Sequence, residues 1–588
     1  MGSRKRRRTV SSLIPHPVVT RPSACPSSIT RACNLPPECI IKILVYLQAS
    51  SLHSCREIGA ETKYRQHGQD DIKSLRSCML VNRTWCEIVA PILWRRPFNY
   101  QPMKTGRWLI DMYLRFLSPE QRKYLGIKLL DKSTPLFDYP SFLRELHYQE
   151  LYIAIFDWEK SHYKSEAEFE KRVAEWTSKT RSHNDLANYF PISKIGAELA
   201  KMFLSKCSTF DLLCLGTSRI EYKWNEVQTA HVALPTFPGA RKALSQLWGF
   251  VCSGDYEKRE IFESMSEYCR EISVLTADGL FEREEGVHEA LSTLIRSQRK
   301  LEIFILCRCF NTFKVLPSLD SQRRTLRYLQ FTECHFMGAD PLLVLQNSDN
   351  AIRQLEFVDC KFFACSKPRD KINCRQLETL KFSKCTSING IIDGFTGCKF
   401  PQLSGLEIAD TACDAAPLYE VLKNAGGSLR ELKVLSVKGI GSGSTLIEHL
   451  ARHCPNLVVL HLALQHEALN KLCILFRATK NLVEMVIDRG TDVRVVHDMS
   501  SVLSSLGADV PASLRVLSIG THCAFQIQAV KVFLGQCKAQ MKSLTLYSYG
   551  GEDENKEVIT GYAGRRKFKI KKVLHNQSAV AKLSVDFD

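Results

Sequence analysis

The chain has 588 residues, of which 45% are hydrophobic and 24% are charged, and its formal net charge is +18. This composition excludes a disordered or fibrous chain, and the length suits either about four domains or one long array of repeats. The sequence has no run of 18 apolar residues, so we expect no membrane span. We expect no secretory signal either, because Pro15 and Pro17 interrupt the short apolar patch near the start.

Much of the positive charge lies in two terminal clusters. Residues 4–8 contribute +5 and residues 565–572 contribute +6, so only +7 is spread over the rest of the chain. A protein that binds a nucleic-acid backbone concentrates positive charge on its folded body, so this distribution speaks against a nucleic-acid partner. Residues 4–8 suit either a nuclear-import signal or a solvated tail, and we expect the protein in the nucleus, the cytoplasm or both.

Residues 1–32 form a basic, Ser/Pro-rich segment that is expected to be disordered. Residues 33–98 predict a small all-α module, because apolar residues recur at helical spacing in 34–47 and 74–97 on either side of a polar insertion near 50–73. So small a unit buries little apolar surface by itself, so it is either a cap for the rest of the chain or a docking module. Residues 99–205 suggest a helical linker or an irregular region.

One phrase recurs through the second half of the chain: an apolar residue followed by two more at positions +3 and +5. Ten copies begin at Leu301, Leu326, Ile352, Leu377, Leu403, Leu432, Leu457, Leu482, Leu514 and Met541, and weaker copies begin at Phe210 and Ile272. Four consecutive copies carry cysteine at +8, namely Cys309, Cys334, Cys360 and Cys385. The pattern is typical of leucine-rich repeats, so residues 206–588 predict an α/β solenoid of about 11–12 repeats, each of 25–32 residues.

Side chains at +3 and +5 of a strand point to the same side, which faces the solenoid interior. The cysteine at +8 then fills core space where the chain leaves the strand. Amphipathic stretches at 443–454, 466–478 and 526–537 are expected to return as helices. The 23 cysteines include no C-x-x-C pair, which favours reduced thiols over disulfides or a zinc site.

Positions +2, +4 and +6 then point outward and form a strand face, expected to be concave, on which we place target binding. Counted over the copies, this face has five acids and two bases, namely Asp278, Glu356, Glu407, Glu484 and Asp488, and Lys381 and Lys438. Its N-terminal part is apolar and contains Leu212, Val274, Ile303, Ile305 and Tyr328. This composition favours a groove for a protein segment with apolar and basic side chains. The alternative is an ordinary exposed β-surface. The predicted target-binding residues are Ile303, Ile305, Tyr328, Gln330, Glu356, Lys381, Glu407, His461 and Glu484.

The N-terminal module resembles the F-box in its Leu35-Pro36-x-Glu38 start, its apolar run at 40–47 and its Cys78-x-Leu80-Val81-Asn82-Arg83-x-Trp85 segment followed by Leu93-Trp94. Together with the repeats, the chain is similar to F-box/leucine-rich-repeat proteins, although the F-box match covers only about a tenth of it. The connection after the first helix is longer than in that family by about twenty polar residues, which we expect to loop out. The resemblance implies that a Skp-family adaptor binds Leu35, Pro36, Glu38, Ile40, Leu44, Leu47, Val81, Trp85, Leu93 and Trp94.

The same resemblance implies the substrate-recognition subunit of an SCF-type cullin–RING ubiquitin ligase. The adaptor would link the chain to the cullin and RING subunits, while the repeats would hold an unidentified target near the charged conjugating enzyme. An adaptor-bound scaffold without a ligase role, or a nucleic-acid-binding protein, are the alternatives. No catalytic residues, cofactor or metal are expected, because phosphate-loop and nucleophile-elbow motifs are missing and His466-Glu467 has Asn470 where a zinc protease needs histidine.

Overall fold

The computed structural model describes residues 36, 38–40, 42, 44, 64–100, 106–128, 134–178, 191–216, 233–254, 257–280, 285–338, 340–346, 349–363, 372–489, 497–520, 523–548, 568–574 and 581–587. The predicted disordered segment 1–32 lies outside these residues. The chain divides into two compact units, Met1–Arg95 and Arg96–Asp588.

The N-terminal unit is helical, as its apolar spacing predicts. It contains α2 (Tyr64–Met79) and α3 (Arg83–Leu93), and residues 38–40, 42 and 44 are also helical. The Asn82 side chain caps α3 by accepting a hydrogen bond from the Trp85 amide at 2.9 Å. One boundary differs from our expectation, because residues 64–73 of the polar insertion do not loop out but form the first part of α2.

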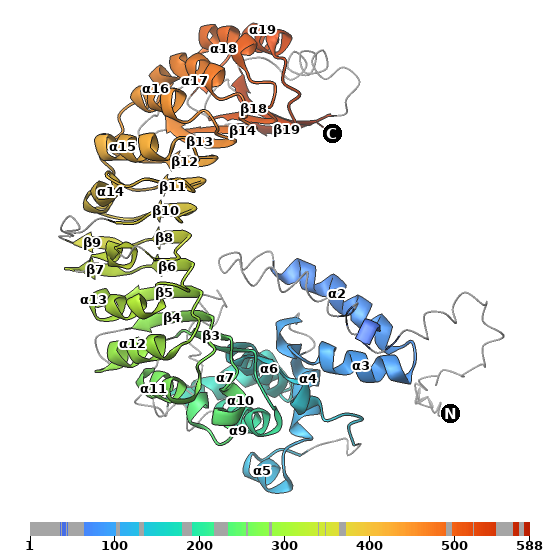
Figure 1. The fold of residues 1–588 in the computed structure, drawn as a ribbon. Coiled ribbons are helices and arrows are strands. Elements are labelled where there is room, and N and C mark those ends of the chain that lie inside the picture. Colours follow the sequence, from blue (N-terminus) through green and yellow to red (C-terminus); the bar gives the residue numbers. More distant parts are fainter. Residues whose placement is uncertain are drawn as a thin grey trace, which may run out of the picture. The chain divides into compact units, whose positions relative to one another are not determined.

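The larger unit is built on one long sheet in which strands distant in sequence lie side by side (Figure 1). Its sixteen strands are, in spatial order, β1 (Glu145–His147), β2 (Leu212–Leu215), β3 (Gly249–Cys252), β4 (Val274–Leu280), β5 (Ile303–Cys309), β6 (Tyr328–Thr332), β8 (Gln354–Val358), β10 (Thr379–Ser383), β11 (Gly405–Ala409), β12 (Glu431–Leu435), β13 (Val459–Leu464), β14 (Glu484–Arg489), β16 (Val516–Ile519), β18 (Ser543–Ser548), β20 (Ala581–Phe587) and β19 (Phe568–Leu574). Two short pairs flank it: β7 (His335–Met337) with β9 (Lys361–Phe363), and β15 (His497–Asp498) with β17 (Cys523–Ala524).

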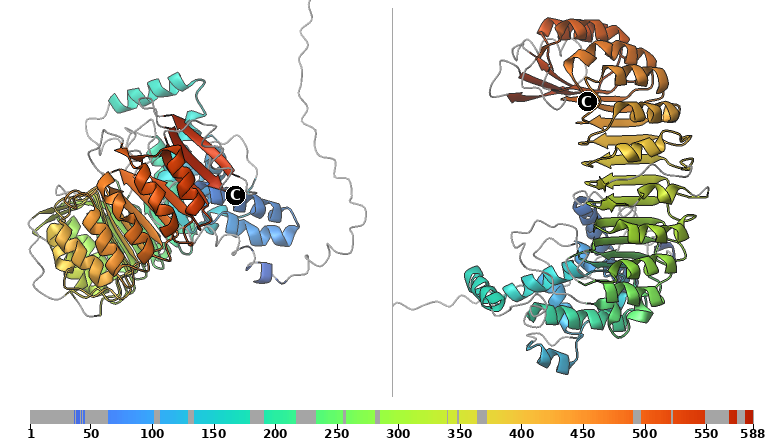
Figure 2. Two further views of the ribbon diagram at one scale, coloured as in Figure 1. Left: turned by 90° about the horizontal axis from the view of Figure 1, so that it is seen from above. Right: turned by 90° about the vertical axis from the view of Figure 1, so that its left-hand side faces the viewer.

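A second layer of helices covers one side of the strands, as two further views also show (Figure 2). Along the repeats these are α11 (Arg259–Tyr268), α12 (Val287–Ser297), α13 (Thr312–Val315), α14 (Asn389–Phe395), α15 (Ala415–Ala425), α16 (Ser444–His453), α17 (Leu472–Ala478), α18 (Ser500–Leu506) and α19 (Ile527–Gln536), with 3₁₀ helices η6 (Leu316–Gln322), η7 (Pro341–Leu345), η8 (His466–Lys471) and η9 (Gly507–Asp509). The earlier part of the unit has η3 (Pro97–Tyr100), α4 (Gly106–Leu114), α5 (Pro119–Tyr124), η4 (Tyr139–Phe142), α6 (Tyr148–Lys160), α7 (Glu166–Ser178), α9 (Pro191–Lys206), η5 (Leu234–Thr236) and α10 (Ala240–Leu244). The unit is therefore a mixed α/β structure with a long parallel sheet, compatible with a leucine-rich-repeat-like solenoid.

The repeated strands begin earlier than residue 206, so the predicted boundary and the count of 11–12 repeats are wrong. β1 pairs in parallel with β2, with Leu146 opposite Leu213, and all strands from β1 to β18 in the spatial order pair in parallel. Leu143, Leu146 and Tyr148 have the +3 and +5 spacing, as do Leu247, Phe250 and Cys252 around β3. Long segments without the phrase separate Leu143 from Phe210 and Phe210 from Leu247, so the sequence alone does not show a regular period here, although Leu247 is 25 residues before Ile272.

The copy that the sequence places at Leu432 begins three residues earlier in the structure, at Leu429. Both Leu432-x-x-Leu435-x-Val437 and Leu429-x-x-Leu432-x-Val434 satisfy the pattern, so the sequence does not choose between them. In the structure Leu432 pairs with Leu406 and Leu460, which places Leu429, Leu432 and Val434 inside.

The C-terminal end also differs from the prediction that residues 206–588 are all repeats. The last parallel strand, β18, pairs antiparallel with β20, which pairs antiparallel with β19. The second half of the basic cluster at 565–572 therefore lies in the edge strand β19 and is not a solvated tail. A lysine-bearing edge strand discourages further strand pairing.

Each strand of the central repeats ends in a left-handed residue that turns the chain toward the helix layer. The residues at +7 have φ between 48° and 55° and are Arg308, Glu333, Asp359, Lys384, Asp410 and Ser436. This turn directs the next side chain inward, and the four cysteines at +8 are buried as predicted. The Cys360 thiol donates to the Phe331 carbonyl at 3.4 Å, and Cys334 and Cys385 bond the preceding repeat in the same way. Burial raises the pKa of the Cys309 thiol to about 12, so these thiols stay protonated and structural.

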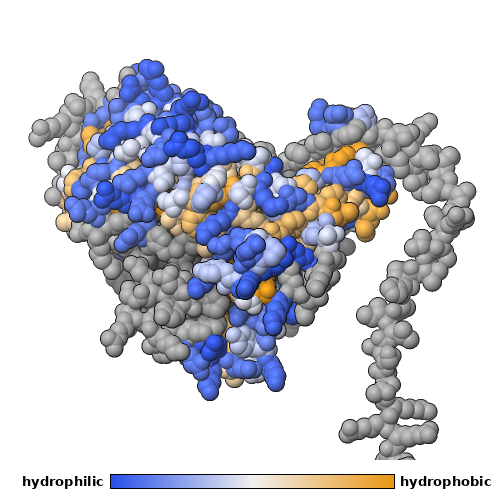
Figure 3. Space-filling view, turned by 90° about the horizontal axis from the view of Figure 1, so that it is seen from below, coloured by the Kyte–Doolittle hydropathy of each residue, from blue (hydrophilic) through white to orange (hydrophobic). Residues whose placement is uncertain are grey.

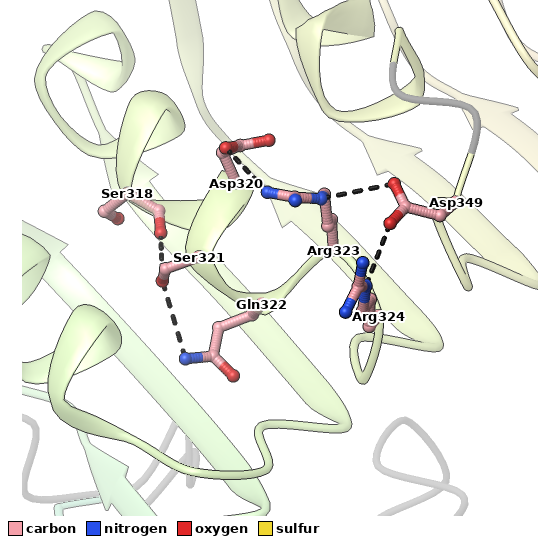
Figure 4. Close-up of polar contacts among 7 residues, drawn as sticks. All are labelled: Ser318, Asp320, Ser321, Gln322, Arg323, Arg324 and Asp349. Atoms are coloured by element: carbon pink, nitrogen blue, oxygen red, sulfur yellow. Dashed lines mark hydrogen bonds and ion pairs between the residues drawn. The ribbon is translucent and has the colours of Figure 1, made fainter.

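Buried amides join successive repeats where the helices end. Gln322 Nε2 donates to the Ile295 and Gln298 carbonyls at 3.0 and 2.8 Å, and its Oε1 accepts from the Leu301 amide at 3.2 Å. Figure 4 shows Gln322 beside Ser321 at the end of η6. The Ile295 carbonyl also accepts from the Gln298 amide, so the Gln322 side chain supplies the partners of two backbone groups, the Gln298 carbonyl and the Leu301 amide, that would otherwise be buried without them.

Replacing Gln322 by Leu is expected to lower the free energy of unfolding by about 3 kcal/mol, because it leaves those backbone groups unsatisfied in the core. Chemical denaturation of the full chain measures the loss. The matched control is Gln354→Leu on the exposed start of β8, for which we expect a change within about 0.5 kcal/mol. Equal effects of the two substitutions would contradict the role assigned to Gln322.

Candidate protein-binding surfaces

The N-terminal unit exposes apolar side chains beside a small core. That core consists of Ile40, Leu44, Leu75 and Val89. In the turn between α2 and α3, Leu80 is 87% exposed and Val81 is 52% exposed. Figure 3 shows the hydrophobic area that this unit presents. An apolar pair exposed to this degree on so small a unit suits a surface that a partner covers.

The predicted adaptor-binding residues divide into three groups. Pro36, Glu38 and Val81 are exposed, and Trp85 and Leu93 are half-buried against the core. Leu35 and Leu47 lie outside the described residues. Ile40, Leu44 and Trp94 are buried, at 2%, 0% and 9% exposure, so the prediction that they face a partner is wrong.

The reason for that correction is that Ile40 and Leu44 pack against α2 and α3. An amphipathic stripe in the sequence shows which residues leave water, but not whether the same chain or a partner covers them. Leu80 belongs to the segment that resembles the F-box but is not among the predicted adaptor-binding residues, because it lies outside the helical periodicity. Its place directly before Val81 and the cap Asn82 marks an apolar turn.

The strand face of the larger unit carries a line of side chains in exact register. Strand pairing places Gln330 opposite Glu356, Glu356 opposite Lys381, Lys381 opposite Glu407, Glu407 opposite Lys433, and Lys433 opposite His461. All are half-buried, so their outer atoms reach solvent. The predicted outward positions of these repeats are thus confirmed, except in β12, where Glu431 and Lys433 take the place assigned to Lys438.

Neighbouring side chains on this face satisfy one another. Lys381 Nζ lies 3.1 Å from Glu407 Oε1, and Lys433 Nζ lies 2.6 Å from Glu431 Oε1. His461 Nε2 lies 2.8 Å from Glu484 Oε1. Burial raises the pKa of the Glu356 carboxyl, while Lys381 opposes that shift. From β8 to β12 opposite charges therefore alternate and pair with one another, whereas the sequence suggested a face with a net negative charge.

The N-terminal part of the strand face is not the open apolar groove we expected. Ile305 is only 3% exposed and Val274 only 8%, whereas Ile303 and Tyr328 are half-buried. The hydroxyl of Tyr328 donates to Gln330 Oε1 at 2.7 Å. Alternation along a strand predicts the direction of a side chain but not what lies over it, so burial of Ile305 was not foreseeable.

Asp278, counted as an exposed acid, is likewise 3% exposed. Both of its carboxylate oxygens accept hydrogen bonds from Arg308, at 2.7 and 2.9 Å. This bidentate pair joins β4 to the turn after β5 and removes Asp278 from the charges available to a ligand.

The helix side carries ion pairs between successive repeats. Arg323 and Arg324 both contact Asp349, at 3.2 and 2.9 Å, and Arg323 also contacts Asp320 (Figure 4). These groups are exposed to water, so each pair adds little to stability. Within the described part of the chain, no cluster of three or more His, Cys, Asp or Glu side chains could hold a metal ion. No described helix has the length and apolar character needed to cross a membrane.

No protein-family model matches the chain, and no curated protein matches it. Among solved structures, the leucine-rich-repeat-containing protein LegL7 from Legionella pneumophila is similar, with 12% sequence identity and a TM-score of 0.26. The match covers 54% of this chain and 92% of that one. A likeness at this level carries no weight for fold or function. The fold is described from the strand register, and the proposed function is argued from the surfaces described above.

Proposed function

We propose that this protein is a substrate-recognition subunit of an SCF-type cullin–RING ubiquitin ligase. The N-terminal unit binds a Skp-family adaptor, which connects it to the cullin and RING subunits, and the repeats hold the target protein. The chain forms no bond itself but raises the local concentration of target lysines near the charged conjugating enzyme.

The observation that carries the proposal is the exposed Leu80–Val81 pair on a unit whose sequence resembles the F-box. Exposed apolar residues of this size in a small unit are the usual centre of a protein interface. The second support is the long strand face, because stacked repeats present extended surfaces of this kind to their partners. Nuclear or cytoplasmic localisation belongs to the same proposal, since ubiquitin ligases of this type act there.

Affinity purification of the full chain distinguishes this proposal from the adaptor-bound scaffold. We expect the adaptor, the cullin and the RING subunit to be recovered together, and a reconstituted complex to form ubiquitin chains on a captured target. Recovery of the adaptor without the cullin would favour the scaffold. Recovery of nucleic acid with a steep salt dependence, and of no adaptor, would favour the nucleic-acid-binding alternative.

A further inference from the structure

Four residues on neighbouring strands form what we call the charge column: Glu356 on β8, Lys381 on β10, Glu407 on β11 and Lys433 on β12. They are opposite one another in the sheet register, so the order along the solenoid is acid, base, acid, base. The side chains of Lys381, Glu407 and Lys433 are 33%, 26% and 29% exposed. Ion pairs at such exposure are weak enough to exchange partners with a ligand.

Short or apolar side chains flank the charge column on one side. On this side, at the ends of the same strands, are Val358, Ser383, Ala409 and Leu435. The row on the other side is Gln354, Thr379, Gly405 and Glu431, and it is polar at both ends. Thr379 covers Gly405, where an added Cβ would meet Thr379 Cγ2 at 2.7 Å, and Glu431 contacts Lys433. A partner element can therefore lie along the column and contact both the charges and a narrow apolar strip.

The spacing of the column selects the secondary structure of that partner. Neighbouring strands lie about 4.8 Å apart, so four strands span about 14 Å. Successive turns of an α-helix rise 5.4 Å, so four residues at i, i+4, i+7 and i+11 span about 16 Å. Four side chains on one side of an extended strand span about 20 Å. A helix matches the column within the reach of flexible Lys and Glu side chains, and an extended segment does not.

We propose that the strand face binds an amphipathic helix of a partner protein whose charged stripe alternates base and acid at successive turns. Each charge of that stripe lies over the opposite charge of the column, and small apolar side chains beside the stripe contact the half-buried Val358 and Leu435. The proposal rests on the part of the proposed function that assigns target binding to the repeats. It names the structure and charge order of the bound segment.

Two synthetic peptides of identical composition test the charge order. Both are alanine-based helices held helical by a hydrocarbon staple on the opposite face, with two Lys and two Glu at i, i+4, i+7 and i+11. One peptide has the alternating order Lys-Glu-Lys-Glu, which in one of its two orientations places an opposite charge over every residue of the column. The other has the block order Lys-Lys-Glu-Glu, which places two of its four charges beside like charges. We expect the alternating peptide to bind the full chain about tenfold more tightly, by fluorescence anisotropy.

An exchange variant provides the decisive comparison. Lys381→Glu combined with Glu407→Lys keeps the net charge and the neighbouring opposite pair, but changes the order of the column to acid, acid, base, base. The block peptide should now bind more tightly than the alternating one. Both preferences should disappear at 1 M salt, where the screening length falls to about 3 Å.

Equal binding of both peptides to the native chain, a preference that the exchange variant does not reverse, or no measurable binding at millimolar peptide would each overturn the proposal. Thermal unfolding of the exchange variant provides the folding control. Adaptor binding, which uses the N-terminal unit, is measured on the same samples. Loss of the peptide preference with intact adaptor binding refutes only the helix-binding inference, whereas absence of adaptor binding by the native chain refutes the proposed function.

Discussion

Replacing Leu80 and Val81 together by Asp is expected to weaken adaptor binding at least about 100-fold. Both side chains are exposed in the turn between α2 and α3, so the native unit gains nothing from burying them. Covering them in a complex would remove apolar surface from water, and full burial of a Leu or Val side chain contributes about 1.5–3 kcal/mol. In the double variant, the two Asp carboxylates would instead lose their hydration when the complex forms, and this loss opposes binding.

The measurement is a titration of the purified full chain with the adaptor, with thermal unfolding recorded in parallel. We expect the melting temperature to stay nearly unchanged, because neither residue belongs to the core and the Asn82 cap is retained. The matched control is Ser77→Asp with Thr84→Asp, which adds the same charge at exposed positions of the same two helices. If the control weakens binding as much, the effect is one of net charge and the apolar turn is not the docking site.

Replacing Phe357 by Ala is expected to cost about 3–5 kcal/mol of unfolding free energy. The ring is fully buried and stacks between Phe331 and Phe382, with centroid distances of 5.4 and 5.2 Å. It also contacts Phe336 and Phe362 edge-on, so truncation leaves a cavity lined by four rings from neighbouring repeats. In a solenoid these neighbour contacts supply much of the stability, and the loss therefore affects adjoining repeats.

Chemical denaturation of the full chain measures this loss, and Phe363→Ala is its matched control. Phe363 is 44% exposed on β9 and loses little buried area, so we expect a change within about 0.5 kcal/mol. A cost below about 1 kcal/mol at Phe357 would mean that the stacked rings do not form the core of these repeats.

The sequence determined the architecture of the larger unit where copies of the repeated phrase follow one another at short, regular intervals. In the copies from Leu301 to Met541 the residues at +3 and +5 are buried, apart from the copy whose register was predicted wrongly. Side chains alternate along a strand, so residues two positions apart face the same side, here the side covered by the helices. The cysteines at +8 are core residues because the left-handed residue at +7 directs the next side chain inward. The helical character of the N-terminal unit likewise followed from residues spaced by one turn.

Only the tertiary structure decided what depends on contacts between distant residues. The register of β12 followed from pairing with β11 and β13, since two overlapping phrases fit the local sequence equally well. Strands β1 and β3 are members of the sheet because they pair with β2 across long segments.

The candidate surfaces divide in the same way. Sequence periodicity identified Ile40 and Leu44 as apolar, but packing against α2 and α3 decided that they are core and that Leu80 is surface. The alternating order of the charge column exists only because residues about 26 positions apart are brought within about 5 Å by the sheet. A local pattern specifies which side chains leave water, whereas the identity of their neighbours is a property of the folded chain.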